Sequence, residues 1–250
     1  MSAFPFRSAV LVLLLAATAC QRGGYQPKAQ LTDTAHLVGA EQPADPQVEA
    51  VVAPYRLKVK QQMDEVIGRA PVAIRKNPGE SPLANFAGDV QRERAARELG
   101  QPIDLGVMTN GGLRAELPAG NITIGSVFEL MPFENELVVL DAPASVVQQL
   151  FNYAAPIHMA ISGATYTATP EGKPVDIRIG KELFDPEKDR TYTIAISDYL
   201  AGGGDKLEFF RPLAPRHTNV LLRTVFQDHI RQLTKEGRPV EAQAEGRVKF

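Results

Sequence analysis

The 250-residue sequence has no tryptophan, a single cysteine and a net charge of only −2. One cysteine excludes an intrachain disulfide and argues against thiol catalysis. The near-neutral balance offers no basic stripe that could neutralise phosphates, so nucleic-acid binding is not expected. The hydrophobic content of 44% is ordinary for a globular chain, and the length suits one large domain or two small ones.

Apolar runs of membrane-spanning length are also missing. The apolar run 9–17 follows Arg7, is too short for a transmembrane helix and matches the hydrophobic part of a signal peptide. It ends in Ala17-Thr18-Ala19-Cys20, which resembles a bacterial lipobox, with Ala17 in the place of the usual leucine. Lipidation at Cys20 would give an exported protein anchored to the cell envelope. The alternative is an ordinary secretory signal with a cysteine nearby.

Three regions follow from this start. Residues 1–20 are expected to be a lipoprotein signal peptide. Residues 21–47 are rich in Gln, Gly, Pro and Ala without a sustained period, which predicts a flexible tether. Residues 48–250 are expected to fold as a single α/β domain, with a mixed sheet packed by helices on its faces.

Local patterns predict the elements of this domain. Ser81-Pro82 is a good helix start and Gly100 a good helix end. Apolar residues at helical spacing predict an amphipathic helix from Pro46 to Asp64, and residues 120–123 are expected to form a turn and cap. The other predicted helices end near Phe128 or span 144–153 and 219–235, and the predicted strands span 66–74, 103–108, 136–140, 166–168, 177–179 and 192–196.

Two glycine loops follow predicted strands. The first, Thr109-Asn110-Gly111-Gly112-Leu113-Arg114, carries an amide and a cation; Arg114 is either a surface charge or a fork for a carboxylate or phosphate. The second, Ser197–Asp205, holds Tyr199 and three consecutive glycines before Asp205. Three glycines let the backbone approach a ligand closely. The alternative is a tight turn with a capping aspartate.

Two further features lie between these loops or before them. Phe133 follows a proline and precedes polar residues, outside any core period, as expected for a lid over the core or a ring that stacks on a flat ligand. Asn85 and Asp89 lie four residues apart and share one helix face, either as satisfied polar groups or as groups that reach a neighbouring site.

Five segments in collinear order resemble the C-terminal domain of the 5′-nucleotidase family. That family has an Asn-x-Gly-Gly-Ile-Arg loop, a Pro-Phe-x-Asn segment and an aspartate-aromatic-leucine-alanine-x-glycine-glycine-aspartate loop. It also has an asparagine-and-aspartate helix and a serine-glycine-x-x-tyrosine strand. The matching segments are 85–89, 109–114, 132–135, 161–166 and 198–205, and the resemblance covers about residues 66–210.

The resemblance implies a nucleotide site. By this implication Phe133 and Tyr199 sandwich a nucleobase, Asp205 contacts the ribose or base, and Arg114 lies near the phosphate. Stacking on aromatic faces contributes on the order of 1–3 kcal/mol per base, and arginine binds phosphate through two hydrogen bonds. The expected substrate-binding residues are Asn85, Asn110, Gly111, Gly112, Arg114, Phe133, Tyr199 and Asp205.

The sequence departs from the family pattern in two places. Thr109 stands where the family has asparagine, with Asn110 in the variable place. Ser81-Pro82 stand where an arginine that binds phosphate is expected. Both departures concern the phosphate more than the base.

Family members hydrolyse phosphate esters with two metal ions held in a separate N-terminal metallophosphatase domain. The four histidines, at 36, 158, 217 and 229, are far apart and belong to no metal-ligand cluster. We therefore expect no catalytic residue, metal or cofactor in this chain. The metals, Mn, Zn or similar, would be held by a metallophosphatase on a partner chain.

The sequence leaves three functions open. The first is the nucleotide-binding half of a split 5′-nucleotidase that acts on extracytoplasmic nucleotides. The second is a non-catalytic lipoprotein that captures nucleosides or nucleotide sugars, which the missing arginine favours. The third is a structural lipoprotein that has lost its ligand, and the joint presence of Phe133, Tyr199 and Asp205 speaks against it.

Overall fold

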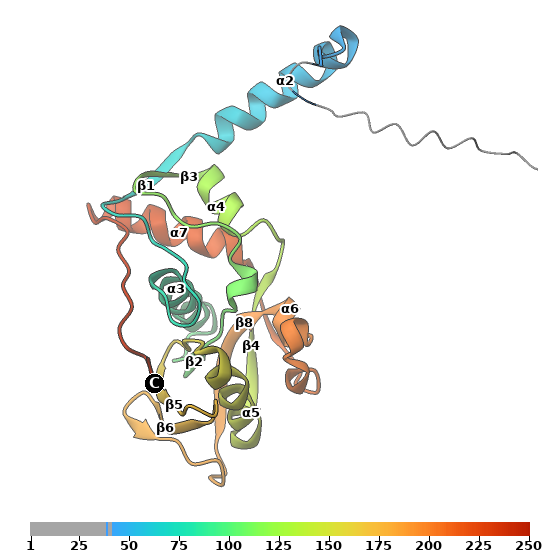
Figure 1. The fold of residues 1–250 in the computed structure, drawn as a ribbon. Coiled ribbons are helices and arrows are strands. Elements are labelled where there is room, and N and C mark those ends of the chain that lie inside the picture. Colours follow the sequence, from blue (N-terminus) through green and yellow to red (C-terminus); the bar gives the residue numbers. More distant parts are fainter. Residues whose placement is uncertain (1–38, 40–41) are drawn as a thin grey trace, which may run out of the picture. The chain divides into compact units, whose positions relative to one another are not determined.

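A computed structural model describes residue 39 and residues 42–250. The chain divides into two units, Met1–Val48 and Glu49–Phe250. The expected signal peptide with Cys20 lies outside the described residues, and so does most of the expected tether, so both remain predictions. The second unit carries the fold described below (Figure 1).

The described helices are α2 (Pro46–Met63), α3 (Pro82–Leu99), α4 (Ile124–Leu130), α5 (Ala144–Ala154), α6 (Asp198–Ala201) and α7 (Leu222–Lys235). The strands are β1 (Val66–Ala70), β2 (Leu105–Gly106), β3 (Gly120–Thr123), β4 (Glu136–Pro143), β5 (Ala164–Ala168), β6 (Pro174–Ile179), β7 (Glu182–Leu183), β8 (Thr191–Ser197), β9 (Arg216–Leu221) and β10 (Val248–Lys249). They form sheets ordered β1-β3, β10-β5-β6-β7 and β2-β8-β4-β9.

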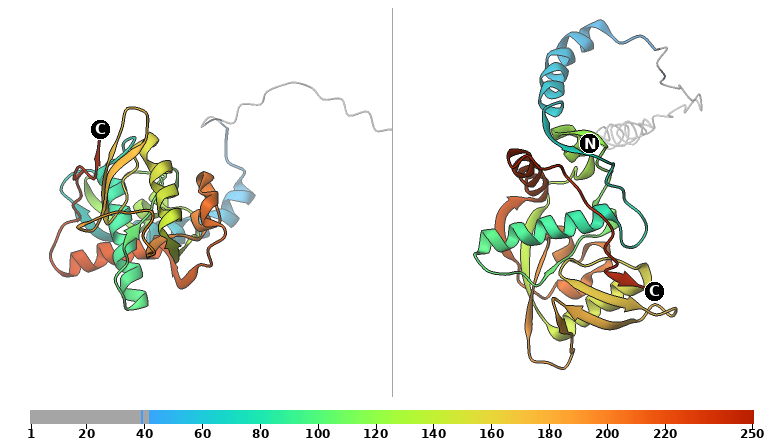
Figure 2. Two further views of the ribbon diagram at one scale, coloured as in Figure 1. Left: turned by 90° about the horizontal axis from the view of Figure 1, so that it is seen from below. Right: turned by 90° about the vertical axis from the view of Figure 1, so that its left-hand side faces the viewer.

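The β2-β8-β4-β9 sheet separates two hydrophobic cores because its side chains alternate between its faces. Val138 and Leu140 of β4 belong to a core with Phe151 of α5. Leu137 and Val139 of the same strand belong to the other core, with residues of α3 and α7. The expected α/β fold, with mixed sheets flanked by helices, is confirmed (Figures 1 and 2).

Local signals set the ends of α3 as the sequence predicts. Ser81 accepts a hydrogen bond from the backbone N–H of Ala84, and Pro82 occupies the first turn. Gly100 ends the helix with φ of 63°, the left-handed conformation that favours glycine at this position.

Several predicted elements need correction. Residues 120–123 form strand β3, paired with β1, instead of a turn. Helix α7 starts at Leu222, because residues 216–221 pair with β4 as strand β9. The strands predicted at 66–74 and 103–108 shrink to β1 and β2.

Helix α2 forms as predicted but ends at Met63, and none of its residues is buried. Tyr55, on its apolar side, is 71% exposed. The apolar spacing therefore predicted the helix correctly, whereas the packing that an amphipathic helix usually makes with its own domain is not present.

The C-terminal segment 238–249 runs from α7 past α3 to β10, which pairs in parallel with β5 (Figures 1 and 2). The backbone N–H of Val240 donates to the carbonyl oxygen of Arg69. Arg247 donates two hydrogen bonds to the carboxylate of Asp89 on α3, at 2.6 and 2.9 Å. Val240 belongs to the core beside α3 and α7, and Val248 to the core beside α5, so the C-terminal segment packs against both cores.

Candidate functional site

Three loops leave the central sheet at one end of neighbouring strands. β2 and β8 are parallel, with Gly106 opposite Ala195, so the loops after both strands leave in the same direction. β4 is antiparallel to β8, with Leu137 opposite Ser197, so the segment before β4 leaves at that end too. Adjacent strands lie about 4.8 Å apart, so the topology gathers the segments 109–114, 132–135 and 198–205 at one sheet edge.

The loop after β8 starts with a short helix. Ser197 caps α6 by accepting a hydrogen bond from the backbone N–H of Leu200. Tyr199 follows and is 54% exposed, so much of its ring faces solvent. Gly204 lies against this ring: a Cβ atom at that position would lie 2.4 Å from Cε1 of Tyr199. Only glycine therefore fits beside the ring without displacing it.

The carboxylate of Asp205 joins two of the loops. The Tyr199 hydroxyl donates to Oδ1 of Asp205 at 3.1 Å, and the Thr109 hydroxyl donates to Oδ2 at 2.6 Å. Asp205 has φ of 51°, in the left-handed region that aspartate visits more readily than most residues. The two hydroxyls thus fix the position of a half-buried carboxylate beside an exposed aromatic ring.

The loop after β2 contains a single 3₁₀ turn, Asn110–Gly112. A Cβ atom at Gly111 would lie 3.1 Å from Oδ2 of Asp205, so the missing side chain lets the loops meet. The Asn110 amide donates to the carbonyl oxygen of Asn77 at 3.0 Å. Arg114 is exposed, and among the described residues its side chain makes one long hydrogen bond, 3.4 Å to the carbonyl oxygen of Gly111.

Lys76 supports the loop after β2 by bonding its backbone carbonyls. Its Nζ donates to the carbonyl oxygen of Leu113 at 2.7 Å and lies 3.4 Å from that of Asn110. An ammonium group that bonds two loop carbonyls holds the backbone on either side of Gly111 and Gly112. Gly112 itself lies close to Met108, with 3.2 Å between a Cβ at that position and the sulfur.

The segment before β4 exposes Phe133, whose side chain is 42% accessible to solvent. The backbone of this segment is held by the start of α7. The Leu222 N–H donates to the carbonyl oxygen of Asn135 at 2.9 Å, and the Arg223 guanidinium bonds the carbonyls of Pro132 and its neighbours. Phe133 therefore presents a free ring on an anchored backbone.

A pocket of about 510 Å³ opens beside Asp205, within the range of roughly 300–1,000 Å³ that is usual for small-molecule sites. Its lining includes Thr109, Asn110 and Gly111 of the first loop together with Tyr153 and His158. Burial and the nearby Asp205 carboxylate raise the pKa of the Tyr153 hydroxyl above its ordinary value of 10.

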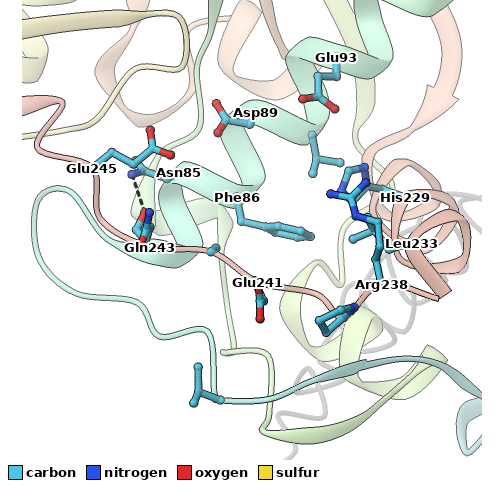
Figure 3. Close-up of a pocket in the computed structure, with 14 residues that line it drawn as sticks. Asn85, Phe86, Asp89, Glu93, His229, Leu233, Arg238, Glu241, Gln243 and Glu245 are labelled. Atoms are coloured by element: carbon cyan, nitrogen blue, oxygen red, sulfur yellow. Dashed lines mark hydrogen bonds between the residues drawn. The ribbon is translucent and has the colours of Figure 1, made fainter. Parts of the chain in front are cut away.

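Asn85 is the one predicted site residue that the structure places away from these loops. It is 2% exposed, and its amide donates to Oε1 of Glu80 at 2.8 Å and to the carbonyl oxygen of Gln243 at 3.0 Å. It lines a different pocket, of about 690 Å³, between α3, α7 and the C-terminal segment (Figure 3).

Thr109, Asn110, Gly111, Tyr199 and Asp205 thus come together directly, and Gly112, Arg114 and Phe133 lie on the adjoining segments at the same sheet edge. The sequence reasoning missed the roles of Lys76, Tyr153 and Arg223. A lysine in a polar loop or an arginine in a helix gives no local signal, because the carbonyls that each one bonds lie 34 to 92 residues away.

Two observations concern the described part of the chain only. No group of three or more His, Cys, Asp or Glu residues between 42 and 250 is placed to hold a metal ion, so these side chains do not fit a two-metal centre. Over the same residues, no helix has both the length and the hydrophobicity that a membrane crossing requires.

The chain is similar to several longer proteins. It is 31% identical over 167 residues to the endonuclease YhcR of Bacillus subtilis, covering 63% of this chain and 13% of that protein. It is 25% identical over 224 residues to the trifunctional nucleotide phosphoesterase YfkN of the same species, covering 82% and 15%. It therefore spans less than a sixth of the length of these two relatives.

The fold is also similar to that of a solved structure. The 5′-nucleotidase precursor of Thermus thermophilus superposes with a TM-score of 0.68 and 26% identity, over 83% of this chain and 43% of that one. The family model described as the 5′-nucleotidase C-terminal domain matches residues 62–212, more than half of the chain. This protein therefore belongs to the 5′-nucleotidase C-terminal domain family.

Proposed function

We propose that this chain is the nucleotide-binding half of a 5′-nucleotidase whose metallophosphatase half is a separate chain. The meeting of two glycine loops at the carboxylate of Asp205, beside the exposed ring of Tyr199, carries the proposal. Family membership supports it, because related proteins include a 5′-nucleotidase and a nucleotide phosphoesterase.

In this proposal each loop binds one part of the nucleotide. The rings of Phe133 and Tyr199 stack on the two faces of the base. Asp205 accepts hydrogen bonds from the ribose hydroxyls. Each carboxylate oxygen has about two lone pairs, and Tyr199 and Thr109 each use one, so acceptor capacity remains for the sugar.

The first loop, residues 109–114, binds the phosphate of the nucleotide. The small residues Gly111 and Gly112 allow a ligand to approach the backbone, and Asn110 lines the adjoining pocket. Arg114 is exposed and its guanidinium can turn from the Gly111 carbonyl to bind the phosphate through two hydrogen bonds.

Hydrolysis belongs to the partner chain in this proposal. The described side chains do not offer the ligands of a two-metal centre, so no chemical step is assigned to this chain. Its contribution is to bind the nucleotide and hold the phosphate ester in one orientation, which lowers the entropic part of the barrier.

The same proposal places the protein outside the cytoplasm. Residues 1–20 form the lipoprotein signal, Cys20 carries the lipid, residues 21–47 form the tether and residues 48–250 the binding domain. The short apolar run after Arg7 and the position of the only cysteine support this arrangement.

Capture of nucleosides without catalysis is the second candidate. Ser81 favours it: at the place where the family pattern has an arginine, this serine is fully buried and caps α3, so no cation is available there. A site for nucleosides would bind adenosine at least as tightly as AMP. A site for nucleotides would prefer AMP, because Arg114 contacts its phosphate.

Calorimetric titration of AMP and of adenosine, with Mn²⁺ present, tests the proposal on the chain without its first twenty residues. We expect saturable binding of AMP that Phe133→Ala and Tyr199→Ala each weaken by about 5- to 150-fold, the equivalent of 1–3 kcal/mol. Tyr55→Ala, which removes an exposed ring from α2, is the matched control and should change nothing. Binding that is indifferent to Phe133 and Tyr199 would contradict the proposal.

A further inference from the structure

Arg223 is a buried cation that faces backbone oxygens. It is the second residue of α7 and only 8% exposed. Its Nη1 lies 3.1 Å from the carbonyl oxygen of Pro132, and 3.4 and 3.5 Å from those of Met131 and Phe133. One guanidinium therefore faces three consecutive carbonyls of the segment that carries Phe133.

The guanidinium is itself held in place. Its central carbon lies 4.0 Å from the ring centroid of Phe128 on α4, a cation–π contact that restricts its movement. The adjacent Leu222 N–H donates to the carbonyl oxygen of Asn135 at 2.9 Å. The first two residues of α7 thus bond both ends of the segment 131–135: Arg223 the carbonyls of 131–133, and Leu222 the carbonyl of Asn135.

An ion pair does not explain the position of Arg223. The nearest carboxylate, that of Glu134, lies 3.4 Å from Nη2, and its side chain is 81% exposed. A carboxylate so exposed adds at most about 1 kcal/mol. The buried guanidinium is satisfied mainly by carbonyls, and the rigid arginine fork suits several acceptors at once, whereas a lysine offers one point charge.

Phe133 depends on this support because it is 42% exposed. The backbone at residues 132–134 therefore sets much of the direction of its ring. A loosened backbone would let the ring turn away from the face that it offers to a base.

We propose that Arg223 is a positioning residue that fixes Phe133 as one wall of the base site. The inference rests on the proposed function, since it assigns Arg223 to the same nucleotide site. Arg223 does not touch the ligand; it acts through the carbonyls of the segment 131–133.

A double-mutant cycle on AMP affinity tests it, with Arg223→Lys, Phe133→Ala and the variant that carries both. We expect Arg223→Lys to weaken AMP binding about three- to tenfold when Phe133 is present, and not at all in the Phe133→Ala background. Coupled residues give such non-additive results, whereas independent ones add. Arg231→Lys, the same change at a half-buried position of α7 that pairs with Glu65 instead of the segment 131–133, is the matched control and should leave affinity unchanged.

Hydrogen exchange of the free protein gives a second readout. Arg223→Lys should speed exchange of the Met131 and Leu222 N–H groups, which donate to the carbonyl oxygens of Val127 and Asn135 at the two ends of this segment, while Arg231→Lys should not. Arg223→Gln, which keeps an uncharged amide NH₂ group as donor, replaces the lysine variant if that variant fails to fold. Equal loss of AMP affinity with and without Phe133, or unchanged exchange at Met131 and Leu222, would overturn the inference.

The two proposals can fail separately. Faster exchange at Met131 and Leu222 together with AMP binding that does not depend on Phe133 would overturn the proposed function. Arg223 would then only anchor the loop. If AMP binding depends on Phe133 but the affinity losses from Phe133→Ala and Arg223→Lys simply add, the inference alone would be overturned.

Discussion

At the residue scale, the site depends on close approach between side chains and glycines. Asp205 receives one hydroxyl from Thr109 and one from Tyr199, and Gly204 leaves room for the Tyr199 ring. Thr109 is the family departure noted in the sequence, and its hydroxyl bonds a carboxylate 96 residues away. The threonine at this position therefore adds a hydrogen bond that joins the first glycine loop to the second.

Gly204→Ala should displace the Tyr199 ring, because the new Cβ would lie 2.4 Å from the ring. Loss of one stacking face costs on the order of 1 kcal/mol, so we expect AMP affinity to fall about fivefold or more. Gly202→Ala is the matched control in the same loop. Its φ is −74° and its Cβ would make contacts of 3.4 Å or longer, so calorimetry should show little change.

At the element scale, Glu80 holds the C-terminal segment through hydrogen bonds. Its carboxylate accepts hydrogen bonds from the Asn85 amide and from the backbone N–H groups of Glu245 and Val248. Burial raises the pKa of the Glu80 carboxyl, but these hydrogen bonds outweigh burial, and the pKa lies below its ordinary value of 4.5. The ionised form of Glu80 therefore stabilises the fold.

A carboxyl whose pKa is lower in the folded state contributes stability above its unfolded pKa and loses it as the pH falls through the folded value. We expect Glu80→Gln to lower the free energy of unfolding by about 1–3 kcal/mol at pH 7, because a charged acceptor of three hydrogen bonds is lost. The difference from wild type should shrink as the pH falls below 4.5. Urea denaturation at pH 7 and pH 3 measures both. Glu187→Gln, an exposed control, should show no difference at either pH.

Helix α2 should contribute little to the stability of its own domain. Tyr55→Ala and Val59→Ala remove exposed side chains, so each should change the free energy of unfolding by no more than about 0.5 kcal/mol. Phe226→Ala, at a fully buried position of α7, should cost about 3–5 kcal/mol. A loss of 2 kcal/mol or more for Tyr55→Ala in denaturant titration would contradict the exposed position of α2.

The elements that the sequence predicted well have local causes. Ser81, Pro82 and Gly100 mark the ends of α3, and each acts within its own turn. The elements that it missed depend on distant partners: β9 and β10 exist because they pair with β4 and β5. The exposure of α2 could not be predicted either, because an apolar stripe does not tell what covers it.

At the scale of the whole molecule, one sheet with two cores gathers loops that are far apart in sequence. The order β2-β8-β4 and the register between these strands place residues 109–114, 132–135 and 198–205 at one edge. The motifs singled out these three loops, and the topology explains why they meet. Asn85 lies apart from these loops, because its amide bonds Glu80 and the C-terminal segment, and its expected role in the site stays a prediction.

The chain covers only part of its relatives, at most 43% of the length of the three proteins compared. The family match covers residues 62–212, and the side chains among residues 42–250 do not fit a two-metal centre. The split between a binding chain and a catalytic chain remains a proposal. In this account the binding chain fixes the nucleotide, and a metallophosphatase on the other chain acts on the phosphate.

A crystal structure of the chain with AMP tests the central claim most directly. The account predicts adenine between the rings of Phe133 and Tyr199, with the ribose hydroxyls on Asp205 and the phosphate towards Arg114. Adenine bound elsewhere, in the pocket lined by Tyr153 and His158 or in the one lined by Asn85 and His229, would contradict it.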